Sequence, residues 1–427
     1  MRRIIAEDPE WNLATVPHLT ELCLKHIVHN FKDNPILLEL LPRHKSKVLT
    51  NLDVNIPLLV TANLIDDEGY WQRCCKSRWQ ICDVLHCGNS WKRMFFEKNL
   101  VEIIERFVPG TTDQNILLET LKLSKDYVVC LNIDQLLPPV KEPPPNVDDE
   151  FSDSDSDAGE GPLYDHLDFN IVLERLPKLE QLHLTYGVKD CGMNFEWNLF
   201  EFTNKDCSLL AKALKSCSTL KLFHLHKSKV DDEKARVIIS HLLDHPSLEI
   251  LDLSYNKLSD SSARAIGKLL NGRSKLVTLD LTDNHISSQG AAAIGHALGK
   301  NTTLKKLNLR HNRLKDEGCQ SLCRSLLKNT TLTELNIGSN NFGIASSALL
   351  GQVLLYNKKL SSINLSCNTL NEEGGKTIQE VMEDNTSLTY MDLRLTDIGQ
   401  ECEYCINQLL KRNRETKRKE EAQLRMK

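Results

Sequence analysis

The sequence predicts an α/β solenoid, a stack of strand–helix repeats, preceded by a mostly helical N-terminal domain. Three observations lead to this prediction. The motif L-x-x-L-x-L-x-x-N-x-L occupies residues 248–258 and returns at a constant interval through the second half of the chain. Its leucines alternate as in a short strand, and the residues after each copy have the apolar spacing of a helix. Residues 1–125 contain helical apolar runs but no copy of the motif.

The interval between copies defines the repeat. Seven copies start at leucines separated by six intervals of 28 residues each, the first at Leu220 and the last at Leu388. These two terminal copies lack the asparagine and carry Ser228 and Thr396 in its place, as expected where an outer repeat must face water. A period of this kind indicates leucine-rich repeats. A 28-residue unit with a full helix resembles the ribonuclease-inhibitor type, which implies a horseshoe.

Each repeat should supply one strand and one helix to a common core. The strands should lie parallel, about 4.8 Å apart, and helical residues such as Ala263, Ile266 and Leu269 should cover the strand leucines. The motif asparagine stands where the strand turns, so its amide can satisfy buried backbone groups of adjacent repeats. These structural asparagines are Asn256, Asn284, Asn312, Asn340 and Asn368.

Upstream of the regular copies the pattern loosens. The stretch "LEQLHLTYGV" from Leu179 resembles a further repeat, but it starts 41 residues before Leu220, so an insertion of about 13 residues intervenes. The stretch "VVCLNID" near Val128 suggests a first strand within residues 126–141. We therefore expect a leucine-rich repeat domain over residues 163–410, with an insertion near 188–206.

The insertion is rich in aromatic residues. It contains Phe195, Trp197, Phe200 and Phe202 within eight residues, in a chain that is only 6% aromatic. One interpretation is that the loop folds back and covers the end of the solenoid. The other is that Trp197 and Phe200 anchor a partner, because exposed aromatic residues form binding hot spots.

The N-terminal domain, residues 1–125, should have a compact helical core. Cysteines and a histidine between residues 74 and 87 raise the question of zinc, but no paired C-x2-C halves are present. The surrounding aromatic residues, among them Trp71, Trp91 and Phe95, favour a packed core instead. Fourteen cysteines in a chain without a recognisable secretory signal indicate free thiols rather than disulfides. We predict no metal and no cofactor.

Two further segments are strongly charged. Residues 142–162 are rich in acids, contain no base and carry alternating serines, a composition that predicts a disordered insert. Residues 411–427 form a tail with eight bases and three acids. This tail is interpreted either as a solvated helix end, where basic residues are favourable, or as a contact with an acidic surface such as tubulin.

Signatures of catalysis are missing from the sequence. It contains no G-x-x-x-x-G-K-[ST], no G-x-S-x-G and no H-E-x-x-H. His224 and His226 share one predicted strand but lack an obvious acidic third member, so we predict no catalytic residue. A formal net charge of −5 and the lack of a basic stripe argue against nucleic acid. No window approaches the roughly 18 apolar residues of a membrane span, and we expect an intracellular protein.

The outward side chains of the strands are the remaining candidates for function. They form polar rows of mixed charge on a rigid concave sheet, a surface better suited to a protein than to nucleic acid. Arg and Tyr on such a sheet can anchor a partner at low entropic cost. The predicted partner-binding residues of the sheet are His224, His226, Lys306, Arg310, Glu334, Tyr390 and Arg394.

Four features together resemble one family. They are the "SWKRMFFEKNL" helical region, the acidic insert, the "YGVKDCGMNFEWNLFEFT" insertion and the 28-residue repeats. The chain is similar to the T-complex-associated testis-expressed protein 1 family, also known as dynein regulatory complex subunit 5. The resemblance implies a non-catalytic scaffold subunit that links outer doublets and conveys signals to dynein in motile cilia and sperm flagella. It implies other complex subunits as partners, and a place in the cytoplasm within the cytoskeleton of the axoneme.

Two other classes of function stay open from the sequence. One is a substrate receptor of a ubiquitin ligase, because the "YW…C…RW…SWKRMF" spacing is loosely similar to F-box-type helical domains. The other is a GTPase activator of the Ran type. In such activators an acidic tail is expected after the repeats, whereas here the acids precede the repeats and the tail is basic.

Overall fold

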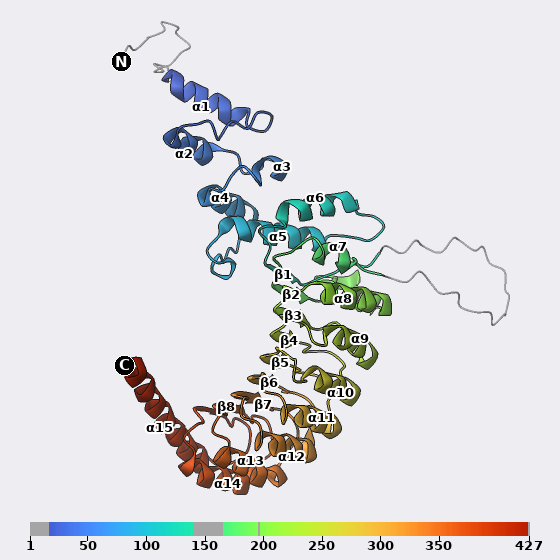
Figure 1. The fold of residues 1–427 in the computed structure, drawn as a ribbon, viewed down its shortest axis with the longest axis vertical. Coiled ribbons are helices and arrows are strands. Elements are labelled where there is room, and N and C mark those ends of the chain that lie inside the picture. The colour runs from blue at the N-terminus through green and yellow to red at the C-terminus, as the bar shows by residue number, and fades with distance from the viewer. Residues whose placement is uncertain (1–16, 140–164, 195–196, 426–427) are drawn as a thin grey trace, which may run out of the picture. The chain divides into compact units, whose positions relative to one another are not determined.

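The computed structural model describes residues 17–139, 165–194 and 197–425. The chain divides into two compact units (Figure 1). The N-terminal unit comprises Met1–Leu100 and Asn115–Val128, and the repeat unit comprises Val101–Gln114 and Val129–Lys427.

The N-terminal unit consists of short helices around an aromatic core. The carboxylate of Asp67 caps α4 by accepting a hydrogen bond from the Tyr70 amide at 2.7 Å. The ring of Trp71 packs on Phe95 and Phe96, with centroid separations of 5.1 and 5.4 Å. The mostly helical N-terminal region that the sequence predicts is confirmed. Its elements are α1 (Leu19–His29), α2 (Pro42–Asn51), α3 (Leu58–Thr61), α4 (Glu68–Arg78), η1 (Leu85–Cys87), α6 (Gln114–Ser124) and the first part of α5 (Trp91–Glu105).

The repeat unit is built on one parallel sheet whose strands follow each other in chain order. From β3 onward, paired residues are 28 apart in sequence, as in the row Phe223, Leu251 and Leu279. The predicted leucine-rich repeat solenoid is therefore confirmed. The strands are β1 (Cys130–Ile133), β2 (Gln181–Leu184), β3 (Leu222–Leu225), β4 (Ile250–Asp252), β5 (Thr278–Asp280), β6 (Lys306–Asn308), β7 (Glu334–Asn336), β8 (Ser362–Asn364) and β9 (Tyr390–Asp392).

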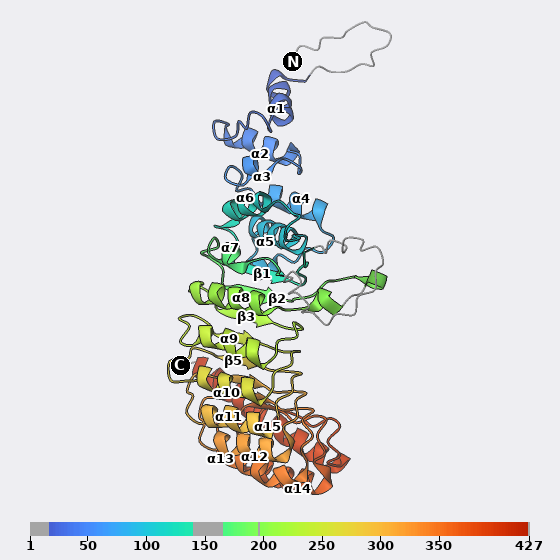
Figure 2. The ribbon, with the colours of Figure 1, turned by 90° about the vertical axis from the view of Figure 1, so that its right-hand side faces the viewer.

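Helices cover one side of this sheet, and Figure 2 looks onto that helical layer. Leu251 of β4 and Ile266 of α10 are fully buried between the layers, and so is Leu253 directly after the strand. The opposite face of the sheet is not covered by any helix of the described residues in Figure 1, and it is called the uncovered face below. The helices are α7 (Phe169–Leu173), α8 (Asn204–Ser216), α9 (Asp232–Leu242), α10 (Asp260–Leu269), α11 (Ser288–Leu298), α12 (Lys315–Leu326), α13 (Ser347–Tyr356), α14 (Asn371–Asp384) and α15 (Gln400–Arg425), with the 3-10 turns η2 (Gly192–Asn194), η3 (Trp197–Phe200) and η4 (Ile344–Ser346).

The motif asparagines bond neighbouring repeats to one another. The amide nitrogen of Asn284 donates to Leu253 O of the previous repeat at 3.0 Å and to Leu281 O of its own repeat at 3.1 Å. Its Oδ1 accepts from Leu258 N at 3.0 Å. In the first regular copy, the Ser228 hydroxyl accepts from Tyr186 N at 2.9 Å instead. The same pattern of amide bonds holds at Asn256, Asn312, Asn340 and Asn368.

A second row of buried asparagines lies after the helices, and sequence analysis did not identify it. The amide of Asn329 donates to Leu298 O at 2.8 Å and to Asn301 O at 3.2 Å. The same type of bond recurs 28 residues later from Asn357 to Leu326 O at 2.7 Å. Some of these asparagines stand in N-T-T or N-T-S triplets, which resemble glycosylation sites. The row comprises Asn301, Asn329, Asn357 and Asn385, and Asn413 within α15 continues it by donating to Asn385 O.

Candidate functional site

The uncovered face of the sheet carries one continuous polar row at its centre. Strand pairing places its members side by side from β1 to β9: Asn132, His183, His224, Asp252, Asp280, Asn308, Asn336, Asn364 and Asp392.

From Asp252 onward the row has a local structural task. The Oδ1 atom of each residue accepts a hydrogen bond from the backbone N–H two residues later, for example Asp280 from Thr282 at 2.9 Å. This bond ends the strand and begins the turn. Side chains also bond across repeats, as in Asn308 Nδ2 donating to Asp280 Oδ2 at 2.8 Å. The acidic and amide groups of the row therefore already make hydrogen bonds within the protein.

Three histidines meet at the β2–β3 end of this face. The Nδ1 atoms of His183 and His224 lie 3.0 Å apart, so one ring donates and the other accepts. The ring of His226 lies 4.2 Å from that of His224 between centroids. Burial and the neighbouring His224 lower the pKa of His183 to about 4 and also lower the pKa of His226. The rings of His183 and His226 are thus mostly neutral at pH 7 and add little positive charge to this end of the face.

The structure corrects one expectation for these histidines. His224 does have an acidic neighbour, because its Nε2 lies 3.1 Å from Asp252 Oδ2. Asp252 belongs to the next repeat, 28 residues along the chain, so its proximity depends on strand pairing. The third ring, His183, was missed for a similar reason, since the insertion separates it from His224 by 41 residues.

The other predicted anchors lie toward the C-terminal end of the sheet. Lys306 pairs with Glu334 at 2.8 Å across β6 and β7. Two strands further, Tyr390 is 49% exposed in the same row. Together with Asp280 and neighbouring side chains of β5–β9, these residues line a shallow groove of about 280 Å³. The groove therefore combines a cation, an anion and a phenol on fixed strands.

The two predicted arginines differ in their roles. Arg394 binds both carboxylate oxygens of Asp392. Its Nε donates to Oδ1 at 2.9 Å and its Nη2 donates to Oδ2 at 2.6 Å. This pairing lowers the pKa of Asp392, whose carboxylate is almost fully buried. Arg310 is exposed, and its charge contributes more weakly to the same lowering of the Asp392 pKa. Arg394 thus stabilises the fold through its bonds to Asp392 and is also exposed on the surface. Arg310 is exposed on the same face.

The aromatic insertion is divided between core and surface. Phe202 is buried and packs on Tyr186 with a centroid separation of 4.3 Å. Phe200 is half-buried, and Lys229 Nζ lies 5.7 Å from its ring centroid. Phe195 and the side chain of Trp197 lie outside the described residues. Phe202 therefore helps to close this part of the solenoid, and Phe200 remains a candidate anchor.

The two charged segments differ in what the structure describes. The acidic insert 142–162 lies outside the described residues. The basic segment 411–427 belongs largely to α15, which continues to Arg425. Leu410 and Asn413 of this helix are buried, and the side chains from Arg414 to Leu424 are exposed.

The described residues contain no group of three or more His, Cys, Asp or Glu side chains placed to hold a metal ion. Cys74, Cys75 and Cys87 are buried thiols, and burial raises the pKa of Cys75 to about 12. None of the helices within the described ranges is long and apolar enough to cross a membrane.

Comparison with known proteins identifies relatives of this chain. A family model described as leucine-rich repeat matches residues 244–267, 274–295, 300–323, 328–343 and 356–378. Dynein regulatory complex subunit 5 of Mus musculus is 57% identical over 250 residues, which is 58% of this chain and 50% of that protein. The protein of the same name from Chlamydomonas reinhardtii is 33% identical over 220 residues, 51% of this chain and 50% of that protein. The chain thus spans about half the length of the curated relatives it matches.

Among solved structures, the actin-binding site 2 of leiomodin-1 aligns with 22% identity and a TM-score of 0.30, over 32% of this chain and 79% of that one.

Proposed function

We propose that this chain is a scaffold subunit of the nexin–dynein regulatory complex in motile cilia and sperm flagella, because half of dynein regulatory complex subunit 5 of Mus musculus matches it with 57% identity over 250 residues. In this role it binds other subunits of the complex, links outer doublets and regulates dynein-driven motility without catalysing a reaction. Its place is the cytoskeleton of the axoneme, within the cytoplasm.

The uncovered face of the parallel sheet is the observation that carries the binding role. Hydrogen bonds between strands and two rows of asparagines hold its backbone in place. Side chains on such a face lose little backbone freedom when a partner binds, which favours affinity. Tyr390 and Arg310 are exposed on this face and belong to the residue types enriched in hot spots. We assign the contact with another subunit to the groove beside them.

The exposed part of α15 supports a second contact. Beyond Asn413 the helix presents Arg414, Lys417, Arg418 and Lys419 to solvent. The bases outnumber the acids in this segment, and a net positive charge attracts an acidic surface and raises the rate of encounter. We propose that this segment contacts an acidic surface of the axoneme, such as tubulin.

Co-assembly with the other subunits of the complex tests the main proposal. The double variant Tyr390→Ala with Arg310→Glu should weaken capture by at least about tenfold, since it removes two anchors. Arg394 is left unchanged because its removal would take away the cation that pairs with the buried Asp392 carboxylate. The matched control is Arg264→Glu with Lys268→Glu on the exposed side of α10.

Both variants should melt within about 2 °C of the wild type, as surface substitutions usually cost under about 0.5 kcal/mol. If the α10 variant weakens capture more than the sheet variant, the binding face lies on the helical side. If neither variant nor the wild type is captured by any subunit, membership of the complex is refuted for this chain.

A further inference from the structure

The β2–β4 end of the uncovered face carries a chain of three bonded side chains. Asp252 Oδ2 lies 3.1 Å from His224 Nε2, and His224 Nδ1 lies 3.0 Å from His183 Nδ1. The other oxygen of Asp252 accepts a hydrogen bond from Ser254 N at 2.9 Å, which fixes the carboxylate. The chain therefore runs from a held carboxylate through two rings to His183 Nε2. Asp252, His224 and His183 are called the histidine relay below.

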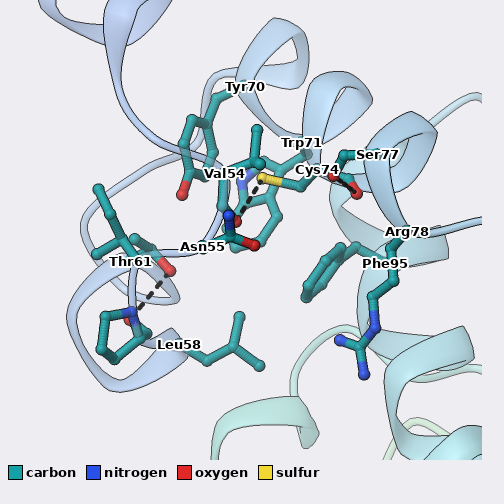
Figure 3. A pocket seen from close by; sticks show the side chains of 12 residues that line it. Val54, Asn55, Leu58, Thr61, Tyr70, Trp71, Cys74, Ser77, Arg78 and Phe95 are labelled. Atoms are coloured by element: carbon teal, nitrogen blue, oxygen red, sulfur yellow. Dashed lines mark hydrogen bonds between the residues drawn. The ribbon is translucent and has the colours of Figure 1, made fainter.

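The last atom of the relay, His183 Nε2, is accessible and has no partner. The ring is half-buried, and no other described residue bonds to this nitrogen, which is not among their fully buried polar atoms. The cleft of the N-terminal unit shows the opposite case in Figure 3. There the hydroxyls of Thr61 and Ser77 donate to Pro57 O and Cys74 O within the protein. The relay thus offers a hydrogen-bonding atom that the fold does not use.

The carboxylate at one end decides which nitrogen of each ring carries a proton. A carboxylate only accepts hydrogen bonds, so His224 Nε2 is the protonated nitrogen and donates to Asp252. In neutral His224 the other nitrogen, Nδ1, accepts a hydrogen bond, so His183 Nδ1 must donate it. Because a neutral imidazole has only one N–H, His183 Nε2 keeps a lone pair. The neutral relay therefore presents a hydrogen-bond acceptor to solvent.

The charges around the relay favour a cation as the donor. Asp252 and the next residue of the row, Asp280, have no lysine or arginine partner within the described part of the chain. The other charged groups around the histidine rings are Asp134, Glu105, Lys189 and Lys227. These are two carboxylates and two lysines, so Asp252 and Asp280 leave a net negative charge. A positively charged donor is thus attracted to this end of the face.

We propose that the histidine relay is a pH-sensitive docking site for an arginine or lysine side chain of another protein, which donates a hydrogen bond to His183 Nε2. Asp252 strengthens that bond, because the members of a hydrogen-bonded chain polarise one another. The site holds whichever protein supplies the side chain, and it does not depend on the groove beside Tyr390.

One added proton reverses the polarity of the relay. The proton binds His183 Nε2, and the proton between the rings moves from His183 Nδ1 to His224 Nδ1. The positive charge then lies on His224, beside the Asp252 carboxylate, where it is most favourable. His183 Nε2 has become a donor, and it faces the donor of the bound side chain. Protonation therefore releases the basic side chain.

Nitrogen NMR of the full chain labelled with 15N-histidine tests this proposal, with His183→Gln identifying the His183 signals. At about pH 7.5 the proton of His183 should be on Nδ1, and on acidification to about pH 5.5 it should appear on Nε2. The probe is the tripeptide Gly-Arg-Gly with blocked ends, and Gly-Glu-Gly is its control. The arginine peptide should shift the His183 Nε2 signal at pH 7.5 and bind at least about tenfold more weakly at pH 5.5. The glutamate peptide should leave that signal unchanged.

His224→Leu removes the ring to which His183 donates, so it should abolish the response to the arginine peptide. The matched control is His285→Leu, at an exposed position outside the relay, which should respond like the wild type. The wild-type proton positions decide the question even if His224→Leu fails to fold. The proposal is overturned if His183 carries its proton on Nε2 at pH 7.5. It is also overturned if the arginine peptide leaves the Nε2 signal unmoved, or if the glutamate peptide binds there instead.

Discussion

Two buried asparagines in each central repeat join that repeat to the one before it. The first, such as Asn284, follows a residue in the left-handed backbone region, which costs a non-glycine residue about 1–2 kcal/mol. The amide bonds of the asparagine offset that cost by fixing the turn in place. The left-handed residues have φ between 50° and 57° and recur at 28-residue spacing: Lys227, Tyr255, Asp283, His311, Ser339, Cys367 and Leu395.

The second asparagine row gives the prediction at the scale of one residue. Asn329→Ala should lower the free energy of unfolding by about 1–3 kcal/mol, because buried carbonyl and amide groups lose their partners. These include Leu298 O and Leu332 N, each 2.8 Å from the side chain. Urea denaturation measures the loss. Thr330→Ala, at the exposed next position, should stay within about 0.5 kcal/mol of the wild type. Equal stability of the two variants would contradict the role assigned to this row.

At the scale of an element, close packing of successive helices depends on small residues. Asp260 at the start of α10 accepts hydrogen bonds from Ser287 N at 2.8 Å and Gly290 N at 2.9 Å, at the start of α11. A Cβ atom on Gly290 would lie 2.5 Å from Asp260 Oδ1 and 2.7 Å from Ile286 Cγ2. The glycine therefore lets the carboxylate reach the next helix.

Gly290→Ala should destabilise the protein although alanine is the better helix former. The favourable propensity is about 1 kcal/mol, while overpacking typically costs about 1–3 kcal/mol and here also displaces a bonded carboxylate. Gly272→Ala is the matched control, since a Cβ there meets no described atom within 4 Å. That control should be neutral or stabilising by up to about 1 kcal/mol. Thermal melts show whether each variant is less or more stable than the wild type. A stabilised Gly290→Ala variant would refute the packing argument.

At the scale of the whole molecule, stability should depend on pH in two steps. His183 has a folded pKa of about 4, below its ordinary 6.5, chiefly because it is buried. Between those values the unfolded chain binds a proton that the folded chain does not, so stability falls as pH drops from about 6.5 to 4. The hydrogen bonds from Arg394 lower the folded pKa of Asp392 below its ordinary 3.8. Its contribution is present above pH 3.8 and is lost as pH falls through the folded pKa.

His183→Gln should therefore make the upper step shallower, since the lowered pKa of His226 still contributes to it, and should leave the lower step unchanged. The measurement is the free energy of unfolding in urea at a series of pH values from 7 to 3. His285→Gln, at an exposed position, should leave both steps unchanged. An unchanged slope between pH 6.5 and 4 in the His183 variant would show that its ring is not buried as described.

The repeat period carries most of the fold information in the sequence. Leu251, Leu279 and Leu307 pair in the predicted register because period-2 leucines and a fixed interval leave one way to stack strands. Side-chain partnerships between repeats were harder to predict. Asp252 reaches His224 only after the strands pair, and Asn329 carries the local signature of a surface triplet although it is buried. Such groups are defined by contacts across the stack rather than by local pattern.

Because each repeat contributes one strand, distances along the sheet increase in equal steps from repeat to repeat. Each strand adds a spacing of about 4.8 Å, so seven steps from β2 to β9 separate His183 from Tyr390 by roughly 34 Å along the sheet. Insertion or removal of one 28-residue repeat would change that separation by one step and leave every other contact pattern intact. The distance between any two groups on this face is therefore set in whole increments by the number of strands between them, whatever their chemistry.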